Sequence, residues 1–315
     1  MSKTTKNSGK RLIFFGNERL ATGVSTTAPT LLALVENGYD VPVVVTNFTA
    51  GKSRNARQLE IQSVAEDCGI EVLFPDKPKD IIEKLRSIYA DVAVLVAYGK
   101  IVPQSIIDLF PRGIINIHPS LLPLHRGPTP IESVILSGES KTGVSIMQLA
   151  KEMDAGPVYA QSELELSGNE SKQELADTLL EIGKSMIIDL LPGIIDGSVV
   201  ALPQNNQHAT YDGLISKQDG KIDWNKPAEQ IEQEIRAYQS WPGSRTEIAG
   251  KDVIVTKASF ETDDNSKLKP GEIKLDKASG MILVDTGDGA IRIERLKPAG
   301  KREMSAAEFL AGLRI

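Results

Sequence analysis

The first third of the chain is dominated by apolar runs at the spacing of alternating strands and helices. Residues 11–16, 41–46 and 92–97 are almost continuously apolar and rich in Val, Ile, Leu and Phe. Segments with helical spacing, such as 29–37, lie between them. A strand buried on both faces has no polar alternation, and helices between such strands are typical of a parallel sheet. The pattern therefore predicts an α/β fold with a mostly parallel sheet.

The predicted sheet would be Rossmann-like in architecture, but the sequence lacks the motif that binds a dinucleotide in many Rossmann folds. No G-x-G-x-x-G follows the first apolar run, which ends at Gly16. That motif lets a dinucleotide pyrophosphate approach the backbone at a helix N-terminus. Its absence argues against a dinucleotide site of the usual kind.

The alternation of apolar strand-like and helical segments stops after residue 201. Residues 202–210 are polar and uncharged, which predicts a linker. Beyond it, one helical segment precedes several short strand-like pieces separated by glycine and acidic turns, which is typical of a small β-barrel. The expected organisation is a disordered tail at 1–10, a catalytic domain at 11–201, the linker at 202–210, and a C-terminal domain at 211–315.

Composition limits the class of protein. The 315 residues carry a net charge of −6, so any nucleic acid would have to bind a local basic patch rather than the overall field. The one cysteine, Cys68, forms no internal disulfide, which fits a reducing compartment. The N-terminal segment lacks the apolar core of a secretory signal, and no run is long enough to predict a membrane span. We therefore expect a cytoplasmic protein.

Two polar side chains interrupt the apolar run at 113–118. Asn116 and His118 are two residues apart, so they face the same side of a strand, and a proline- and glycine-marked loop follows. Such loops at strand ends hold the sites of open α/β sheets. Asp154 lies in a Gly-Pro loop after the next strand, at the same edge if the parallel arrangement continues. From these residues alone, a core histidine with hydrogen-bond partners remains an equally good interpretation.

An amide, an imidazole and a carboxylate suit direct acyl transfer. Asn116 and His118 can donate to a developing oxyanion, and Asp154 can hold the imidazole and accept a proton from an attacking amine. Ser120 lacks a G-x-S-x-G context, and no His or Cys pair has the spacing of a metal site, so we expect neither a serine nucleophile nor a metal.

The motifs around these residues resemble the folate-dependent formyltransferases. The similar pieces are Asn116-x-His118, Ser120-Leu121-Leu122-Pro123, Arg126-Gly127, the Asp154 loop and Val96-Ala97-Tyr98-Gly99. In the second half they are Ile222-Asp223-Trp224, Trp241-Pro242-Gly243 and the ending Pro298-Ala299-Gly300-Lys301 with Met304-Ser305-Ala306. That ending is similar to the branch of the family that acts on methionyl-tRNA.

The resemblance implies a reaction and its residues. The formyl group of 10-formyltetrahydrofolate would pass to the α-amino group of methionyl initiator tRNA, with no metal. Asn116, His118 and Asp154 would be catalytic, and Ser120, Leu121, Leu122 and Pro123 would bind folate beside Val96 and Tyr98. Lys52 and Arg54 would contact the tRNA, and the C-terminal domain would be an OB-like tRNA-binding module. The protein is expected to act as a monomer.

Two rival functions remain open. Ile-Asp-Trp and Trp-Pro-Gly also occur in sugar-nucleotide N-formyltransferases, and a non-catalytic RNA- or folate-binding module could keep the same fold. Pro119, directly after His118, matches the purine-pathway relatives rather than the tRNA enzymes. Formylation assays with each acceptor distinguish these functions.

Overall fold

The computed structural model describes residues 10–47, 59–261 and 269–313. Lys52 and Arg54, the expected tRNA contacts, and nearly all of the expected N-terminal tail lie outside these ranges. The chain divides into two compact units. The N-terminal unit comprises Met1–Ile131, Lys141–Leu166 and Gln173–Gly213, and the C-terminal unit comprises Glu132–Ser140, Ser167–Lys172 and Leu214–Ile315.

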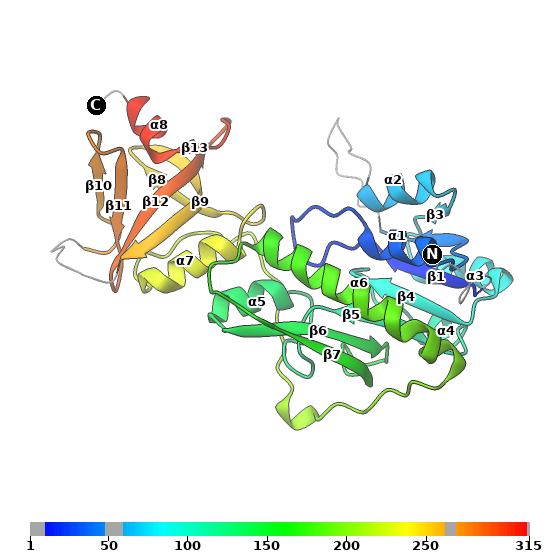
Figure 1. Cartoon of the computed structure of the whole chain (residues 1–315). Coiled ribbons are helices and arrows are strands. Elements are labelled where there is room, and N and C mark those ends of the chain that lie inside the picture. Colours follow the sequence, from blue (N-terminus) through cyan, green and yellow to red (C-terminus); the bar gives the residue numbers. More distant parts are fainter. Residues whose placement is uncertain (1–9, 48–58, 262–268, 314–315) are drawn as a thin grey trace, which may run out of the picture. The chain divides into compact units, whose positions relative to one another are not determined.

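The N-terminal unit is built on a seven-stranded sheet with the order β3-β2-β1-β4-β5-β6-β7 (Figure 1). Its strands are β1 (Leu12–Gly16), β2 (Val43–Val45), β3 (Glu71–Leu73), β4 (Val92–Val96), β5 (Ile114–His118), β6 (Lys141–Gln148) and β7 (Val158–Glu165). Strands β1 to β5 pair in parallel, whereas β6 is antiparallel to both β5 and β7. The predicted mostly parallel, Rossmann-like sheet is confirmed.

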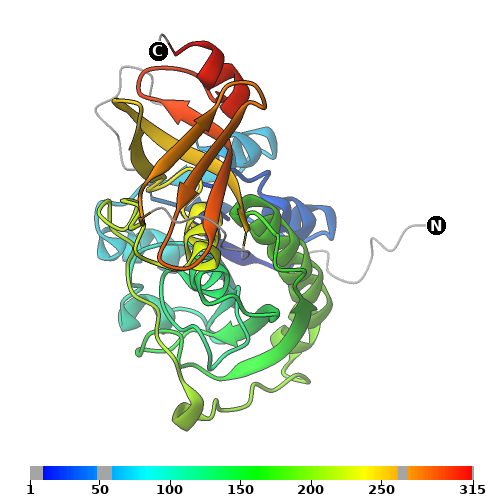
Figure 2. The ribbon, with the colours of Figure 1, turned by 90° about the vertical axis from the view of Figure 1, so that its left-hand side faces the viewer.

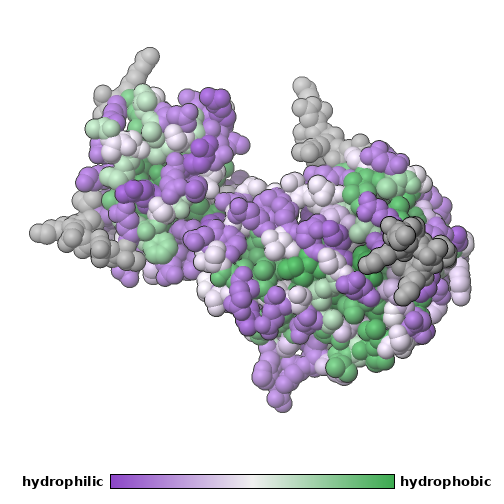
Figure 3. Space-filling model, in the orientation of Figure 1, coloured by the Kyte–Doolittle hydropathy of each residue, from purple (hydrophilic) through white to green (hydrophobic). Residues whose placement is uncertain are grey.

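Helices cover this sheet. They are α1 (Pro29–Glu36), α2 (Glu60–Asp67), η1 (Pro78–Ile81), α3 (Ile82–Ile88), α4 (Gln104–Ile107) and α6 (Lys172–Asp196), while α5 (Pro130–Ser137) follows the loop after β5. The long helix α6 packs closely on the sheet at Gly183, where an added Cβ would lie 2.4 Å from the Ile117 side chain. Figure 3 shows hydrophilic residues along the outer side of α6 and apolar residues beside it.

A buried carboxylate completes the start of α1. The residue before α1, Ala28, is in the left-handed conformation and provides no side-chain cap. Glu18, from the loop after β1, accepts hydrogen bonds from the backbone N–H groups of Thr30 and Leu31, both at 2.8 Å. Burial raises the pKa of Glu18 to about 7, although the two N–H donors favour its ionised form. The carboxyl group therefore titrates near neutral pH.

The C-terminal unit contains a curled antiparallel sheet, half of a barrel, with the order β10-β11-β12-β9-β8 (Figure 2). Its elements are α7 (Ala228–Ala237), β8 (Ser244–Ile248), β9 (Lys251–Glu261), β10 (Ile273–Asp276), β11 (Met281–Asp285), β12 (Ala290–Pro298), β13 (Met304–Ser305) and α8 (Ala306–Ala311). Strand β12 changes register against β9 after Ile293, and such irregularities bend a strand. Apolar residues of α7, α8 and the sheet form one core.

A fully buried ion pair lies within the C-terminal unit. Lys172 is 1% exposed and Glu132 0% exposed, and Lys172 Nζ lies 3.6 Å from Glu132 Oε1. Lys172 also donates to the carbonyl oxygen of Trp241 at 3.0 Å. Burial lowers the pKa of Lys172, and the Glu132 charge opposes that shift. The pair joins the start of α5, the start of α6 and the turn before β8.

No helix in the described part of the chain is long and apolar enough to cross a membrane.

Candidate active site

Strand β5 carries Asn116 and His118 on one buried surface. The strand lies between β4 and β6, with Asn116 paired to Leu95 on one side and to Met147 on the other. Asn116 is 6% exposed and His118 is 4% exposed. Within the described ranges the Asn116 side chain forms no hydrogen bond. Because a buried amide without a partner is unfavourable, this amide is suited to a bound polar group.

A main-chain carbonyl fixes the His118 ring. His118 Nε2 lies 2.9 Å from the carbonyl oxygen of His125, and because a carbonyl only accepts, Nε2 carries a hydrogen. The other ring nitrogen, Nδ1, lies 3.9 Å from Asp154 Oδ1. Nδ1 therefore faces the carboxylate across a gap wider than a hydrogen bond, and it is the edge of the ring available to a substrate.

Asp154 reaches His118 by a route different from the predicted one. We expected a parallel strand to bring its loop to the same sheet edge, and that reasoning is wrong because β6 is antiparallel to β5. Strand β6 ends where Gln148 pairs with Ile115, away from His118, and the following turn returns to the site. There Asp154 Oδ2 accepts a hydrogen bond from Gly127 N at 2.9 Å, and the residue has a φ of 50°. The expected trio is nevertheless brought together.

The Ser120–Pro123 loop is held by buried polar groups. Ser120 is 0% exposed, and its hydroxyl donates to the Leu124 carbonyl at 2.7 Å, so this side chain stabilises the loop itself. Ser145 on β6 donates to the Ser120 carbonyl at 2.7 Å and accepts from Leu122 N at 3.0 Å. Gln161 on β7 donates to the Leu122 carbonyl and to Ser145 Oγ, both at 2.8 Å. Sequence reasoning did not find Ser145 and Gln161, whose only signal is polarity within strands.

Val96 and Tyr98 lie at the end of β4, beside β5, but their side chains are in the protein core. Val96 is 0% and Tyr98 2% exposed, and the Tyr98 ring packs edge-to-face on Phe15 with 5.5 Å between centroids. Burial raises the pKa of Tyr98 to about 12, so its phenol stays neutral. A ligand at this edge would therefore meet mainly the main chain of residues 96–98.

The segment expected to be a linker instead packs against the site. Arg126, 1% exposed, donates to the side chains of Gln204, Asn206 and Tyr211. The His125 ring lies 3.2 Å from both carboxylate oxygens of Asp212. Sequence reasoning missed both residues, because Gln204 was assigned to a polar linker and Asp212 to the start of the C-terminal domain.

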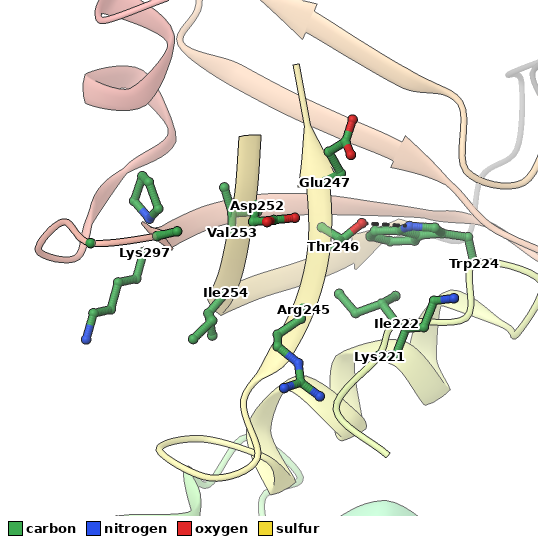
Figure 4. Close-up of a pocket in the computed structure, with 13 residues that line it drawn as sticks. Lys221, Ile222, Trp224, Arg245, Thr246, Glu247, Asp252, Val253, Ile254 and Lys297 are labelled. Atoms are coloured by element: carbon green, nitrogen blue, oxygen red, sulfur yellow. Dashed lines mark hydrogen bonds between the residues drawn. The ribbon is translucent and has the colours of Figure 1, made fainter. Parts of the chain in front are cut away.

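A hollow of about 690 Å³ lies on the C-terminal unit (Figure 4). Ile222, Ile254 and Trp224 supply its apolar surface, and Trp224 Nε1 donates to Thr246 Oγ1 at 3.2 Å. Figure 4 shows the charged ends of Lys297, Arg245 and Lys221 spread from left to right across the hollow, with the carboxylates of Asp252 and Glu247 between and above them. The hollow therefore combines an apolar surface with three basic and two acidic side chains.

In the ranges that the structure describes, no group of three or more His, Cys, Asp or Glu side chains is arranged to hold a metal ion.

Comparison with known proteins identifies the family. Residues 20–191 match the formyl transferase domain, and residues 214–314 match the formyl transferase C-terminal domain. The methionyl-tRNA formyltransferase of Chloroflexus aggregans is 38% identical over 307 residues, covering 96% of this chain and 97% of the relative. That of Geobacter metallireducens is 34% identical over 311 residues, covering 98% and 97%.

Solved structures share the fold at lower identity. An N-formyltransferase from Helicobacter canadensis in complex with folinic acid and dTDP-3-aminofucose has a TM-score of 0.65 at 18% identity, covering 94% of this chain and all of that chain. HypX from Aquifex aeolicus in complex with tetrahydrofolic acid has a TM-score of 0.65 at 18% identity, covering 96% of this chain and 46% of HypX. On the full-length matches, the chain belongs to the formyltransferase family, in its methionyl-tRNA formyltransferase branch.

Proposed function

We propose that this enzyme transfers the formyl group of 10-formyltetrahydrofolate to the α-amino group of methionyl initiator tRNA. The observation that carries the chemistry is the buried Asn116 amide, which has no hydrogen-bond partner among the described residues, beside His118, whose Nδ1 lies 3.9 Å from the Asp154 carboxylate. The full-length similarity to methionyl-tRNA formyltransferases supports the choice of acceptor.

In the proposed mechanism the amine nitrogen attacks the formyl carbon directly. A nitrogen–carbon bond forms as the carbonyl π electrons move to oxygen, and Asn116 Nδ2 and protonated His118 Nδ1 donate to that oxyanion. Asp154 accepts the proton lost by the attacking nitrogen. The oxyanion then collapses, the bond from the formyl carbon to N10 of the folate breaks, and N10 takes up the proton that Asp154 accepted, which returns the carboxylate to its starting state. No covalent enzyme intermediate is required.

The formyl donor is proposed to bind between the Ser120–Pro123 loop and the main chain of residues 96–98. Support comes from the fixed geometry of this loop, which Ser145 and Gln161 hold from two strands. Preorganisation of this kind lowers the entropic cost of placing a ligand. It would present the formyl group to the Asn116 amide at the end of β5.

The body of the tRNA is proposed to contact the hollow of the C-terminal unit. Lys221, Arg245 and Lys297 offer positive charge to phosphates, and the apolar surface around Trp224 offers a stacking or packing surface. Lys52 and Arg54 remain proposed contacts for the acceptor end. We also propose that the enzyme acts as a monomer.

One assay tests the proposed function. Purified enzyme receives a formyl donor labelled in the formyl group and, separately, methionyl initiator tRNA, uncharged initiator tRNA or an amino-sugar nucleotide. Label should pass to methionyl-tRNA only, in acid-precipitable form. Transfer to the amino-sugar nucleotide alone would instead establish the sugar-directed activity, and transfer to no acceptor would favour a binding module.

A further inference from the structure

Residues 202–213, here termed the strap, form hydrogen bonds to the loop after β5 and to the Asp154 turn. Thr210 Oγ1 accepts from His125 N at 2.8 Å, and the Thr210 carbonyl accepts from Arg126 N at 3.0 Å. Asp212 N donates to the Arg126 carbonyl at 2.8 Å. The strap therefore fixes His125, whose own carbonyl fixes the His118 ring.

Gln204 connects the two catalytic loops through a single side chain. Its Oε1 accepts from Arg126 Nε at 3.1 Å and from an Arg126 terminal nitrogen at 2.7 Å. Its Nε2 donates to the carbonyl oxygens of Asp154 and Gly156, both at 2.7 Å. Because arginine only donates and carbonyls only accept, the amide can adopt one orientation only. Both of its hydrogens and its oxygen are used.

The turn carrying Asp154 is held from both sides by these contacts. On one side Gly156 packs so closely on β6 that an added Cβ would lie 1.9 Å from the Gln148 carbonyl. On the other side are the two hydrogen bonds from Gln204. Asp154 has a φ of 50°, a left-handed conformation that is uncommon outside glycine and that Asp and Asn tolerate best. Without Gln204 the turn would lose one of these two restraints.

We infer that Gln204 is a positioning residue for formyl transfer, acting through the main chain of the Asp154 turn. The inference rests on the proposed function and assigns a role to a residue fifty positions beyond Asp154 in the sequence. Gln204 does not touch the reacting atoms. Its removal should therefore slow the chemical step and leave substrate binding in place.

The test compares the same substitution at two glutamines of the strap. In Gln204→Glu one carboxylate oxygen still accepts from Arg126, but the other faces two carbonyl oxygens and repels them. Gln207 is exposed, and its side chain forms no hydrogen bond or ion pair within the described ranges, so Gln207→Glu is the matched control. We expect Gln204→Glu to lower kcat about 10- to 100-fold, as a displacement of about 1 Å does, with KM values unchanged. Gln207→Glu should match the wild type.

A second readout does not depend on the acceptor. The chain has three histidines, so ring carbon signals from labelled histidine can be assigned with single variants. At fixed pH the His118 signal should shift in Gln204→Glu, because Asp154 moves, while the His208 signal stays in place. If Gln204→Glu fails to fold, Gln204→Met, similar in length, takes its place. A Gln204→Glu variant with the kcat of the wild type and an unshifted His118 signal would overturn the inference. Equal effects of the substitutions at Gln204 and Gln207 would overturn it too. Inactivity of the wild type on methionyl-tRNA would count only against the proposed function.

Discussion

Glu18 should make the stability of the enzyme depend on pH in a direction opposite to that of most carboxylates. Its pKa of about 7 in the folded protein lies above the ordinary value of 4.5. A carboxyl group with a raised folded pKa contributes stability that is fully present below the unfolded pKa and is lost as pH rises through the folded pKa. The window is therefore pH 4.5 to 7.

The size of the effect follows from the same two pKa values. Each unit of difference between the folded and unfolded pKa corresponds to about 1.4 kcal/mol of unfolding free energy. Most of the change between the two pKa values falls in the range from pH 5 to pH 8. Relative to Glu18→Gln, which does not titrate, the wild type should lose roughly 2 to 3 kcal/mol of unfolding free energy over that range. Glutamine keeps one acceptor for the N–H groups of Thr30 and Leu31, so the α1 cap is weakened but not removed.

Urea unfolding followed by circular dichroism at pH 5, 6, 7 and 8 measures this difference directly. Glu83→Gln is the control, because that carboxylate is 83% exposed and pairs with Arg86 one turn away. The unfolding free energy of the wild type minus that of Glu18→Gln should fall steadily as the pH rises. The corresponding difference for Glu83→Gln should not change with pH. A constant difference for Glu18, or one that rises with pH, would refute the reasoning.

Three further predictions concern other parts of the chain. Lys172→Met leaves the buried carboxylate of Glu132 without this cation and should lower the free energy of unfolding by about 3 to 5 kcal/mol, measured by tryptophan fluorescence. The double variant Lys172→Met, Glu132→Leu should recover most of that loss. No recovery would show that the two side chains do not stabilise each other as a buried pair. Gly156→Ala should lower kcat at least about tenfold by displacing the catalytic turn, with an unchanged circular dichroism spectrum, and wild-type turnover would contradict the geometry. Lys297→Glu should weaken binding of all tRNAs alike and flatten its salt dependence in filter-binding assays, whereas an unchanged salt slope would place the tRNA elsewhere.

Sequence patterns predicted which segments form strands better than they predicted strand direction. Continuous apolar runs identified β1, β2 and β4, because burial on both faces removes polar positions from such strands. Strand β6 (Lys141–Gln148) was also expected from its sequence, yet it pairs antiparallel with β5. The direction of β6 depends on the path of the chain through the preceding loop and α5. The pattern of apolar residues within a strand does not encode that path.

The candidate site was visible from sequence only where its side chains are chemically distinctive. Asn116 and His118 stood out because polar groups are rare in a buried strand. The partner that orients His118 is a main-chain carbonyl, at His125, and every residue type has one. Gln204 was hidden for a different reason: its polarity is ordinary for a linker, and only the fold reveals that it faces Arg126 and the Asp154 turn.

The central claim is that the Asn116 amide and the His118 ring stabilise the oxyanion of formyl transfer. Single-turnover transfer from labelled 10-formyltetrahydrofolate to methionyl initiator tRNA tests it most directly in Asn116→Ala, because this amide has no side-chain hydrogen bond to lose within the described part of the fold. The account predicts a rate lower by about 10²- to 10³-fold, with folate affinity and the unfolding curve unchanged. A rate within a few-fold of the wild type would contradict it.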